Sequence, residues 1–296
     1  MYAITGASGH LGRKVVASLK HRVRASEIVA VVRNPAKAAD LGVDVREADY
    51  TDVHALDAAF AGIDKLLLIS SNSLDRQPEH ANVLAAAKTA GVKHILYTSL
   101  LHAESWNIPF AQDHLVTEQW LKALGTDYTI LRNGWYWENN TLRFPAAVQF
   151  GSLIGCAGDA EVSWASRQDF ADAAVAVMTG AGHEGETYEL AGDKAYTLTD
   201  LAREAERQIG KPVAYTNLSE ADFAATLENV GLPKPMALGL AEIEARGVST
   251  GVLKDGSGNL SRLIGRPTAS IQDAVSDALA VITPADQSWP GKRRMV

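Results

Sequence analysis

The sequence has almost no cysteine and no long apolar run. Cys156 is the only cysteine among 296 residues, so no disulfide can form within the chain, which suits a reducing compartment. A lone cysteine in an apolar setting usually packs, so we do not expect Cys156 to act as a nucleophile. No apolar stretch approaches the ~20 residues that span a bilayer. The first expected strand begins at Tyr2, which leaves no room for a signal peptide. These absences favour a cytoplasmic protein.

Positive charge is also scarce, since the formal net charge is −7. This balance favours solubility and gives no general attraction to nucleic acid or anionic membranes, so we expect neither as a partner. The only concentrated basic run is Lys292-Arg293-Arg294, which we interpret as a solvated tail. The length suits one large α/β unit with an attached lobe, or two small domains.

Short apolar segments alternate with helical ones through the first half of the chain. The predicted strands are 2–5, 28–32, 43–46, 65–70, 94–99 and 128–132, and helices are predicted over 9–20, 54–60, 79–90 and 113–124. Strands this apolar and β-branched are buried on both faces, which indicates a parallel sheet with helices on each side. Right-handed crossovers then give an α/β fold with a doubly wound parallel Rossmann sheet.

This rhythm breaks after about residue 133. We predict helices over 167–179, 197–210 and from 219, strands at 187–190 and 212–217, and a glycine-rich loop over 247–259. We interpret residues 1–150 as an NAD(P)-binding Rossmann domain whose sheet is completed by about 160–195. Residues 196–296 are expected to form a smaller C-terminal α/β lobe that covers the substrate, followed by the tail.

The strongest motif is a glycine-rich turn between the first strand and the first helix. It reads Gly6-Ala7-Ser8-Gly9-His10-Leu11-Gly12. Glycines at this spacing let the backbone approach a pyrophosphate, while the helix N-terminus offers free N–H groups and the positive end of its dipole. A strand before the motif and an apolar helix after it favour a dinucleotide site over a structural turn. The predicted cofactor residues here are Gly6, Ser8, Gly9, His10, Leu11 and Gly12.

The residues after the second strand distinguish between cofactors. A site for NADH usually has an acid there, which accepts a hydrogen bond from the ribose 2′-OH. This chain has Arg33 instead, with Lys37 close behind, and a cation pairs with a 2′-phosphate. The pattern favours NADPH, with NADH as a weaker ligand; a solvated Arg33 is the alternative. Asp49 follows the third strand, where it is suited either to accept from the adenine amino group or to cap the next turn.

With these residues identified, the chain resembles the NmrA-like group of atypical short-chain dehydrogenases. It is similar in particular to the type 2 NADPH:quinone oxidoreductases and the triphenylmethane reductases. The resemblance covers nearly the whole chain up to about residue 282, and its most specific segments are 5–12, 32–37, 65–71, 97–103 and 131–136. It implies a nicotinamide-dependent reductase without flavin or metal, and it adds Ser70, Ser71 and Thr98 to the expected cofactor site.

The chain departs from the dehydrogenase superfamily at its catalytic pair. Typical members carry Tyr-x-x-x-Lys on the helix after the fifth strand, and here His114 and Glu118 stand in those places. Ser99 keeps a hydroxyl at the end of the fifth strand, where the crevice would hold the nicotinamide. His114 is a candidate proton donor to the product; a packed or solvated histidine is the alternative.

The loss of this pair bears on the substrate. Hydride addition to an isolated ketone makes a strongly basic alkoxide and needs a proton donor. A quinone instead yields an anion whose basicity is near that of phenol, with a reference pKa of ~10. The missing pair therefore argues against an alcohol dehydrogenase and for a readily reduced acceptor.

Aromatic side chains follow the sixth strand. Trp135 and Tyr136 are suited to stack on a planar ring, while Asn133 holds a carbonyl or a carboxamide. His102 is a candidate for the opposite wall, and core packing is the alternative for each ring. The predicted catalytic residues are thus His114, Ser99 and Asn133.

These features predict an NADPH-dependent reductase that transfers a hydride to quinones or similar conjugated electrophiles. The alternative is a redox sensor of the NmrA type that binds NADP without turnover. The expected partner is a small aromatic or quinone substrate. The sequence leaves both a monomer and a homodimer open, and it does not distinguish quinones from dyes or nitroaromatics.

Overall fold

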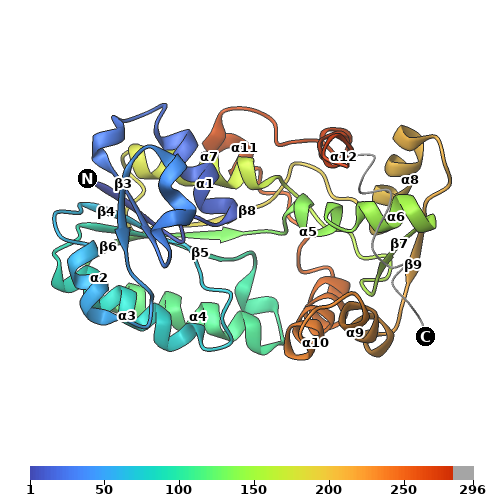
Figure 1. Cartoon of the computed structure of the whole chain (residues 1–296), viewed down its shortest axis with the longest axis horizontal. Coiled ribbons are helices and arrows are strands. Elements are labelled where there is room, and N and C mark those ends of the chain that lie inside the picture. Colours follow the sequence, from blue (N-terminus) through green and yellow to red (C-terminus); the bar gives the residue numbers. More distant parts are fainter. Residues whose placement is uncertain (283–296) are drawn as a thin grey trace. The chain divides into compact units, whose positions relative to one another are not determined.

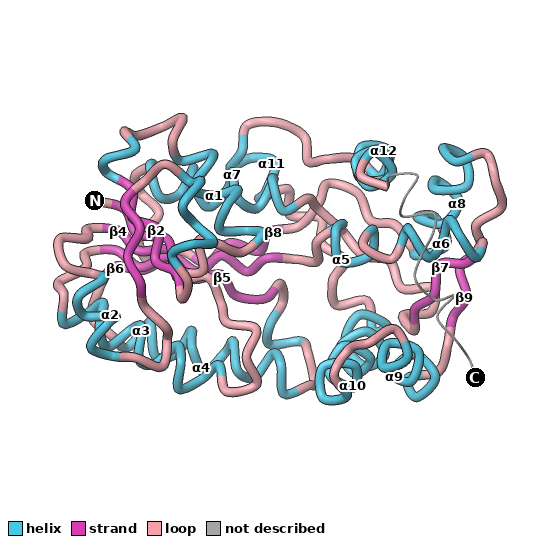
Figure 2. The backbone as a smooth tube through the Cα atoms, in the orientation of Figure 1, coloured by secondary structure: helices cyan, strands magenta, loops and turns pink. Residues whose placement is uncertain are grey.

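The computed structural model describes residues 1–282. Its main feature is a sheet of seven parallel strands in the order β3-β2-β1-β4-β5-β6-β8 (Figures 1 and 2). The strands are β1 (Tyr2–Thr5), β2 (Ile28–Val32), β3 (Asp44–Glu47), β4 (Lys65–Leu68), β5 (His94–Leu100), β6 (Asp127–Asn133) and β8 (Thr187–Leu190). The strand order reverses between β1 and β4, so the predicted doubly wound sheet is confirmed. The basic run at 292–294 lies outside the described residues.

Helices cover both faces of this sheet (Figure 1). One face carries α1 (His10–Leu19), α7 (Arg167–Thr179) and α11 (Asn259–Ile264), and the other carries α2 (Val53–Ala59), α3 (Arg76–Thr89) and α4 (Pro109–Ala123). All seven residues of β5 are buried, as expected for a central parallel strand covered by helices on both faces. Apolar side chains of the strands and of α2 to α4 form a core cluster that includes Leu56, Leu66, Leu68, Val83, Leu84, Ile95, Tyr97, Leu121 and Ile130.

The chain forms two compact units, each built from three segments. The sheet unit comprises residues 1–134, 167–190 and 257–267, and the small unit comprises 135–166, 191–256 and the residues from 268 on. Of these residues from 268 on, the structure describes those up to 282. The small unit contains a second sheet, in which β7 (Ser152–Gly155) pairs in parallel with β9 (Ala214–Asn217). The functional roles predicted for 1–150 and 196–296 stay predictions.

Six α-helices form most of the regular structure described in the small unit. They are α5 (Trp137–Thr141), α6 (Phe144–Phe150), α8 (Leu198–Ile209), α9 (Glu220–Asn229), α10 (Lys234–Glu242) and α12 (Ile271–Ala280). The predicted start and end of α8 are confirmed. The Thr197 hydroxyl accepts from the backbone N–H of Asp200 at 3.1 Å, and the helix ends at Gly210 with φ 72°.

Some predicted boundaries were wrong. Helix α4 begins at Pro109 rather than near 113, because proline at the first helical position needs no N–H partner. Strand β4 ends at Leu68 rather than at 70, since the N–H of Ile69 donates to the Thr5 hydroxyl at 3.1 Å instead of continuing the ladder. The glycine-rich segment over 247–259 is only partly a loop, because 248–250 form a 3₁₀ turn and α11 starts at Asn259.

The described residues bear on two expectations, the lack of a membrane-spanning segment and the packing role of Cys156. Among the helices of residues 1–282, none is both long and apolar enough to cross a membrane. Cys156 is buried, and this burial, followed by the charge of Glu244, raises the pKa of its thiol to about 12. A thiol that stays protonated agrees with the packing role predicted for it.

Glu244 is the buried acid that links β7 to the helical part of the small unit. Its carboxylate accepts the backbone N–H of Cys156 at 2.9 Å and pairs with Arg143 at 2.8 Å. Glu244→Ala would leave the guanidinium without its carboxylate, so we expect a loss of about 3 kcal/mol in the free energy of unfolding. Urea denaturation measures the loss. The control is Glu242→Ala, which removes an exposed pair with Arg246 at 3.9 Å and should cost less than about 1 kcal/mol. Equal losses would contradict this account.

Candidate functional site

A cavity of about 490 Å³ lies in the sheet unit, beside the loops that follow β1, β2, β3 and β4. Doubly wound sheets bind ligands at this edge, near the point where the strand order reverses, and the volume suits a small-molecule site. Eight of the predicted cofactor residues line it: Gly6, Ser8, Gly9, His10, Arg33, Asp49, Ser70 and Ser71.

The glycine loop leaves room for an anion. Gly6 has φ 59°, in the left-handed region that favours glycine. A Cβ added at Gly12 would lie 2.4 Å from the carbonyl oxygen of Gly6, so the loop and α1 can pack this closely only with glycine there. The N-cap of α1 is Gly9, which has no side chain to occupy the first N–H groups of the helix. These features fit a bound pyrophosphate.

A half-buried tyrosine, Tyr50, supports the floor of the cavity. The Tyr50 hydroxyl lies 2.5 Å from the Thr5 hydroxyl and 2.8 Å from the carbonyl oxygen of Ile69. Burial raises the pKa of Tyr50, so it remains a neutral phenol, and its single hydrogen goes to one of these two oxygens. The end of β1 is thereby tied to the end of β4. Tyr50 was not predicted as a site residue, although its place next to Asp49, in the loop after β3, was a usable signal.

Arg33 and Asp49 face each other at the rim. Arg33 Nε lies 4.0 Å from Asp49 Oδ2, and the arginine side chain is 77% exposed, so the guanidinium is accessible to a phosphate. The other oxygen of Asp49 accepts the N–H of Thr51 at 2.9 Å and its hydroxyl at 2.7 Å. These two hydrogen bonds lower the pKa of Asp49. The turn-capping alternative is therefore present, and the adenine contact stays a prediction.

The remaining predicted cofactor residues do not line the cavity: Leu11, Gly12, Lys37 and Thr98. Leu11 is buried on the apolar face of α1. The Thr98 hydroxyl accepts the N–H of Ser70 at 2.8 Å, so it supports the cavity wall from behind. Cavity-lining residues that the sequence analysis missed are Val31, Val32, Ala48, Tyr50, Ile69, Asn72, Ser73 and Glu79.

His80, on α3, fixes the loop after β4. Its Nε2 accepts the backbone N–H of Ser71 at 2.9 Å, and its Nδ1 lies 2.9 Å from the Thr117 hydroxyl. Because Nε2 is an acceptor, the ring is neutral and carries its hydrogen on Nδ1. Burial, followed by the charge of Arg76, lowers the pKa of His80 to about 4. No sequence pattern indicated this contact, which depends on how α3 packs.

The candidate proton donor, His114, is buried in α4. Its Nδ1 lies 2.7 Å from the Tyr97 hydroxyl, and its ring meets the edge of Phe110 with centroids 5.0 Å apart. Burial, then the charges of Arg76 and His80, lowers the pKa of His114 to about 3. These contacts correspond to the packed alternative, and a catalytic role for His114 stays a prediction.

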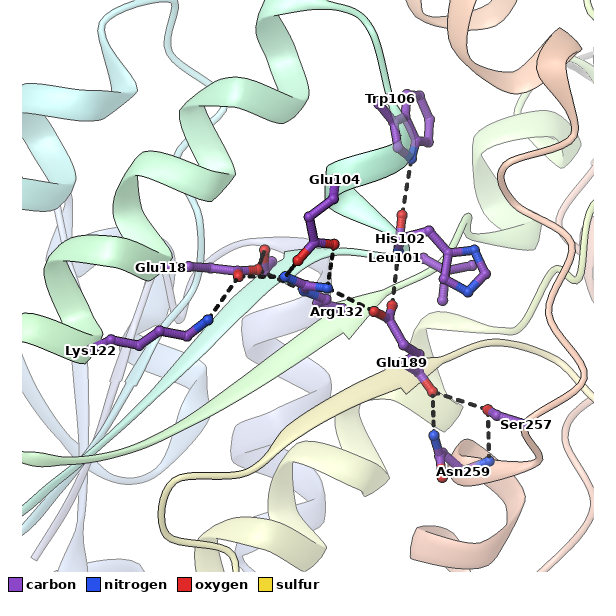
Figure 3. A network of polar contacts seen from close by, with 11 residues as sticks. Leu101, His102, Glu104, Trp106, Glu118, Lys122, Arg132, Glu189, Ser257 and Asn259 are labelled. Atoms are coloured by element: carbon purple, nitrogen blue, oxygen red, sulfur yellow. Dashed lines mark hydrogen bonds and ion pairs between the residues drawn. The ribbon is translucent and has the colours of Figure 1, made fainter.

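Ser99 belongs to a network of buried charges shown in part in Figure 3. Its hydroxyl donates to Glu118 Oε1 at 2.6 Å, and Glu118 pairs with Arg132 at 2.7 Å. Since the hydroxyl hydrogen points to Glu118, the Ser99 oxygen can act toward a ligand as an acceptor. Nearby, the carbonyl of Asn133 accepts the N–H of Leu101 at 3.0 Å. Thr98, Ser99 and Asn133 thus lie at the carboxyl ends of β5 and β6, as predicted.

The aromatic candidates Trp135 and Tyr136 belong to the small unit. The carbonyl of Trp135 accepts the N–H of Ala165 at 3.3 Å, and Tyr136 forms an isolated bridge with the same residue. Both are half-buried, and their substrate contacts stay a prediction. His102 lies on the turn after β5 in the sheet unit. No group of three or more histidine, cysteine or acidic side chains with a metal-like arrangement occurs within residues 1–282.

Comparisons with known proteins now add to this geometry. A family model described as NAD(P)H-binding matches residues 6–181. The chain belongs to this NAD(P)H-binding family. Quinone oxidoreductase 2 of Escherichia coli is 54% identical over 280 residues, which cover 93% of this chain and 98% of that protein.

Solved structures agree. The NADPH-dependent quinone oxidoreductase of Escherichia coli complexed with NADPH is 53% identical, with a TM-score of 0.90 over 94% of this chain and 100% of that one. The Citrobacter triphenylmethane reductase complexed with NADP(H) is 38% identical, with a TM-score of 0.89 over 94% and 100%. The predicted resemblance to the NmrA-like atypical short-chain dehydrogenases, and to these two groups within it, is confirmed.

His80 makes stability depend on pH. Its pKa is about 4 in the folded chain and about 6.5 in an unfolded one, so folding favours the neutral ring. This contribution is present above pH 6.5 and is lost as the pH falls toward 4, by roughly 3 kcal/mol in total. His80→Leu should flatten the rise of unfolding free energy between pH 4 and 6.5 by up to about 1.4 kcal/mol per pH unit.

Urea denaturation at a series of pH values measures this slope, and His21→Leu, at an exposed turn, is the control. His80→Leu should also weaken NADPH binding several-fold, because Ser71 loses its anchor. A slope equal to that of the unchanged protein would refute the assignment.

Proposed function

We propose that this chain is an NADPH-dependent oxidoreductase that reduces quinones and similar conjugated electrophiles. The observation that carries the proposal is the glycine-loop cavity with Arg33 at its rim. It occurs in a chain 54% identical to a protein named quinone oxidoreductase 2, and a solved relative at 53% identity holds NADPH.

Different residues of the sheet unit would bind different parts of the cofactor. Gly6 to Gly12 would hold the pyrophosphate at the N-terminus of α1, and Arg33 would pair with the 2′-phosphate. Ser70 and Ser71 would line the path toward the ends of β4 and β5. When bound, NADPH supplies a hydride from the nicotinamide ring.

The polar groups at the carboxyl ends of β5 and β6 would orient the reacting rings. Ser99 offers an acceptor oxygen suited to the carboxamide N–H, since its own hydrogen goes to Glu118. We assign Asn133 to the same region, and Trp135 and Tyr136 to stacking on the acceptor. His114 stays a candidate proton donor, although its burial and low pKa favour a structural role.

The absence of a strong acid among the described residues of the site indicates the class of electron acceptor. A reduced quinone is a weak base, so positioning the two rings supplies much of the catalysis and strong acid help is dispensable. A sensor that binds NADP without turnover is the second candidate, and the neutral, buried His114 in place of an acid favours it. We expect the protein to act in the cytoplasm on small aromatic substrates, as a monomer or a homodimer.

Turnover separates the two candidates. We expect the purified protein, freed of flavin, to oxidise NADPH when 1,4-benzoquinone or a naphthoquinone is added, and to do so more slowly with NADH. Absorbance at the NADPH band measures the reaction across a panel of quinones, triphenylmethane dyes and nitroaromatics. Binding of NADPH with no oxidation by any acceptor would support the sensor and overturn the reductase.

Arg33 should determine the choice of cofactor. Arg33→Glu replaces the partner of the 2′-phosphate with a group that repels it and accepts from a ribose 2′-OH. The ratio of the dissociation constants of NADH and NADPH should fall at least tenfold, as measured by fluorescence titration. Arg24→Glu is the control, since Arg24 is 81% exposed and pairs with Glu27 outside the cavity. An unchanged ratio in Arg33→Glu would show that another residue reads the phosphate.

A further inference from the structure

His102 has an unusual backbone conformation. Within residues 1–282 it is the only non-glycine residue with positive φ, at φ 50° and ψ 41°. Such a conformation is strained for a residue with a side chain, and it persists only where surrounding contacts impose it. His102 lies between β5 and the 3₁₀ turn Ala103–Ser105, at the carboxyl edge of the sheet where the reacting groups bind.

A carboxylate from β8 holds the backbone of His102. The N–H of His102 donates to Glu189 Oε2 at 2.8 Å, and the other oxygen of Glu189 pairs with Arg132 Nη1 at 2.8 Å (Figure 3). Arg132 is on β6, and Glu189 is on the neighbouring strand. The conformation of His102 is therefore fixed by charges that belong to two strands of the rigid sheet.

The turn is also held on both sides of His102. Glu104 pairs with Arg132 through two hydrogen bonds of 2.6 and 2.5 Å. Trp106 Nε1 donates to the carbonyl of Leu101 at 2.9 Å. Arg132 thus pairs with Glu104, which belongs to the turn, and with Glu189, which accepts a hydrogen bond from the turn. We call Arg132, Glu104 and Glu189 the turn clamp.

The imidazole of His102 lies outside this clamp. Figure 3 shows the ring on the side of the turn that faces away from the guanidinium of Arg132, and the residue is half-buried. Glu189 contacts the backbone N–H of His102, and Arg132 contacts Glu104 and Glu189. The clamp thus keeps the backbone of His102 in a strained conformation, and this conformation determines where the imidazole ring points. We take the orientation of the ring to be the function of the clamp.

We propose that the turn clamp holds His102 in the left-handed conformation so that its imidazole N–H contacts the carbonyl oxygen of the electron acceptor. His102 is then a residue that determines acceptor specificity, and Glu189 is its positioning residue. The proposal rests on the proposed function. In the reaction NADPH gives a hydride, one proton with two electrons, to the acceptor and becomes NADP⁺, and the reduced acceptor takes its second proton from solvent. The imidazole N–H stabilises the negative charge that develops on the oxygen.

Two substitutions at His102 separate the effect of backbone strain on stability from the effect of the imidazole on the reaction. Glycine adopts this conformation freely, so His102→Gly should leave the melting temperature unchanged or higher. It should lower kcat/KM for menadione by 10- to 100-fold, while the dissociation constant of NADPH stays within twofold. His102→Asn keeps an N–H donor and tolerates the conformation, so its loss should be smaller. The control is Lys122→Met, which removes a contact with Glu118 at 3.7 Å outside the clamp and should change none of these values.

A double-mutant cycle tests the role of Glu189. Where His102 is present, Glu189→Ala should lower kcat/KM for menadione. In the His102→Gly protein it should produce little further loss, because the ring that it positions is gone. Full additivity of the two losses would show that Glu189 does not act through His102 and would overturn the positioning role.

A binding measurement separates this inference from the proposed function. Protein loaded with NADP⁺ and labelled with ¹³C at the histidine rings is titrated with menadione, and the His102 signal is identified by its absence in His102→Asn. A shift of that signal supports the contact even if the protein shows no turnover, in which case the proposed function alone fails. Turnover without a shift, and with unchanged kinetics in His102→Gly, would overturn the contact and leave the proposed function standing.

Discussion

The arrangement at the carboxyl edge of β5, β6 and β8 depends on one buried cation, Arg132. Burial by itself would lower the pKa of its guanidinium, but hydrogen bonds to Glu118, Glu104 and Glu189 raise it above its ordinary value. A buried charge is tolerated only where such partners surround it, and the planar guanidinium can serve several carboxylates at once. Through these contacts Arg132 fixes Ser99 and the backbone of His102.

The cofactor side of the sheet is organised in a similar way, by neutral groups instead of charges. Tyr50 and Thr5 join the ends of β1 and β4, and His80 anchors the loop that begins at Ser71. Tyr50 lines the floor of the cavity, whereas Thr5 and His80 do not line it, and burial keeps the phenol and the imidazole uncharged. The loop after β4 is therefore held in place by hydrogen bonds from side chains of the sheet and of α3.

The sequence was sufficient for the features that depend on local chemistry. The glycine loop, the strands of the main sheet and Arg33 at the rim were all predicted, because each has a short-range pattern with a physical reason. Contacts made by packing were not predictable. His80 meets Ser71 only because α3 lies beside β4, and Arg132 looks like an ordinary strand residue until Glu104, Glu118 and Glu189 surround it. Strand β7 was missed because its four residues pair with a strand more than sixty positions further along the chain.

The central claim is that a bound NADPH gives its hydride directly to an aromatic acceptor at this edge. Single-turnover kinetics test it most directly, with the flavin-free protein loaded with NADPH that carries deuterium at C4 of the nicotinamide on one face or the other. Rapid mixing with menadione should oxidise the bound NADPH, with a primary isotope effect for deuterium on one face only. Bound NADPH that survives mixing, or that is oxidised with no isotope effect on either face, would contradict the account.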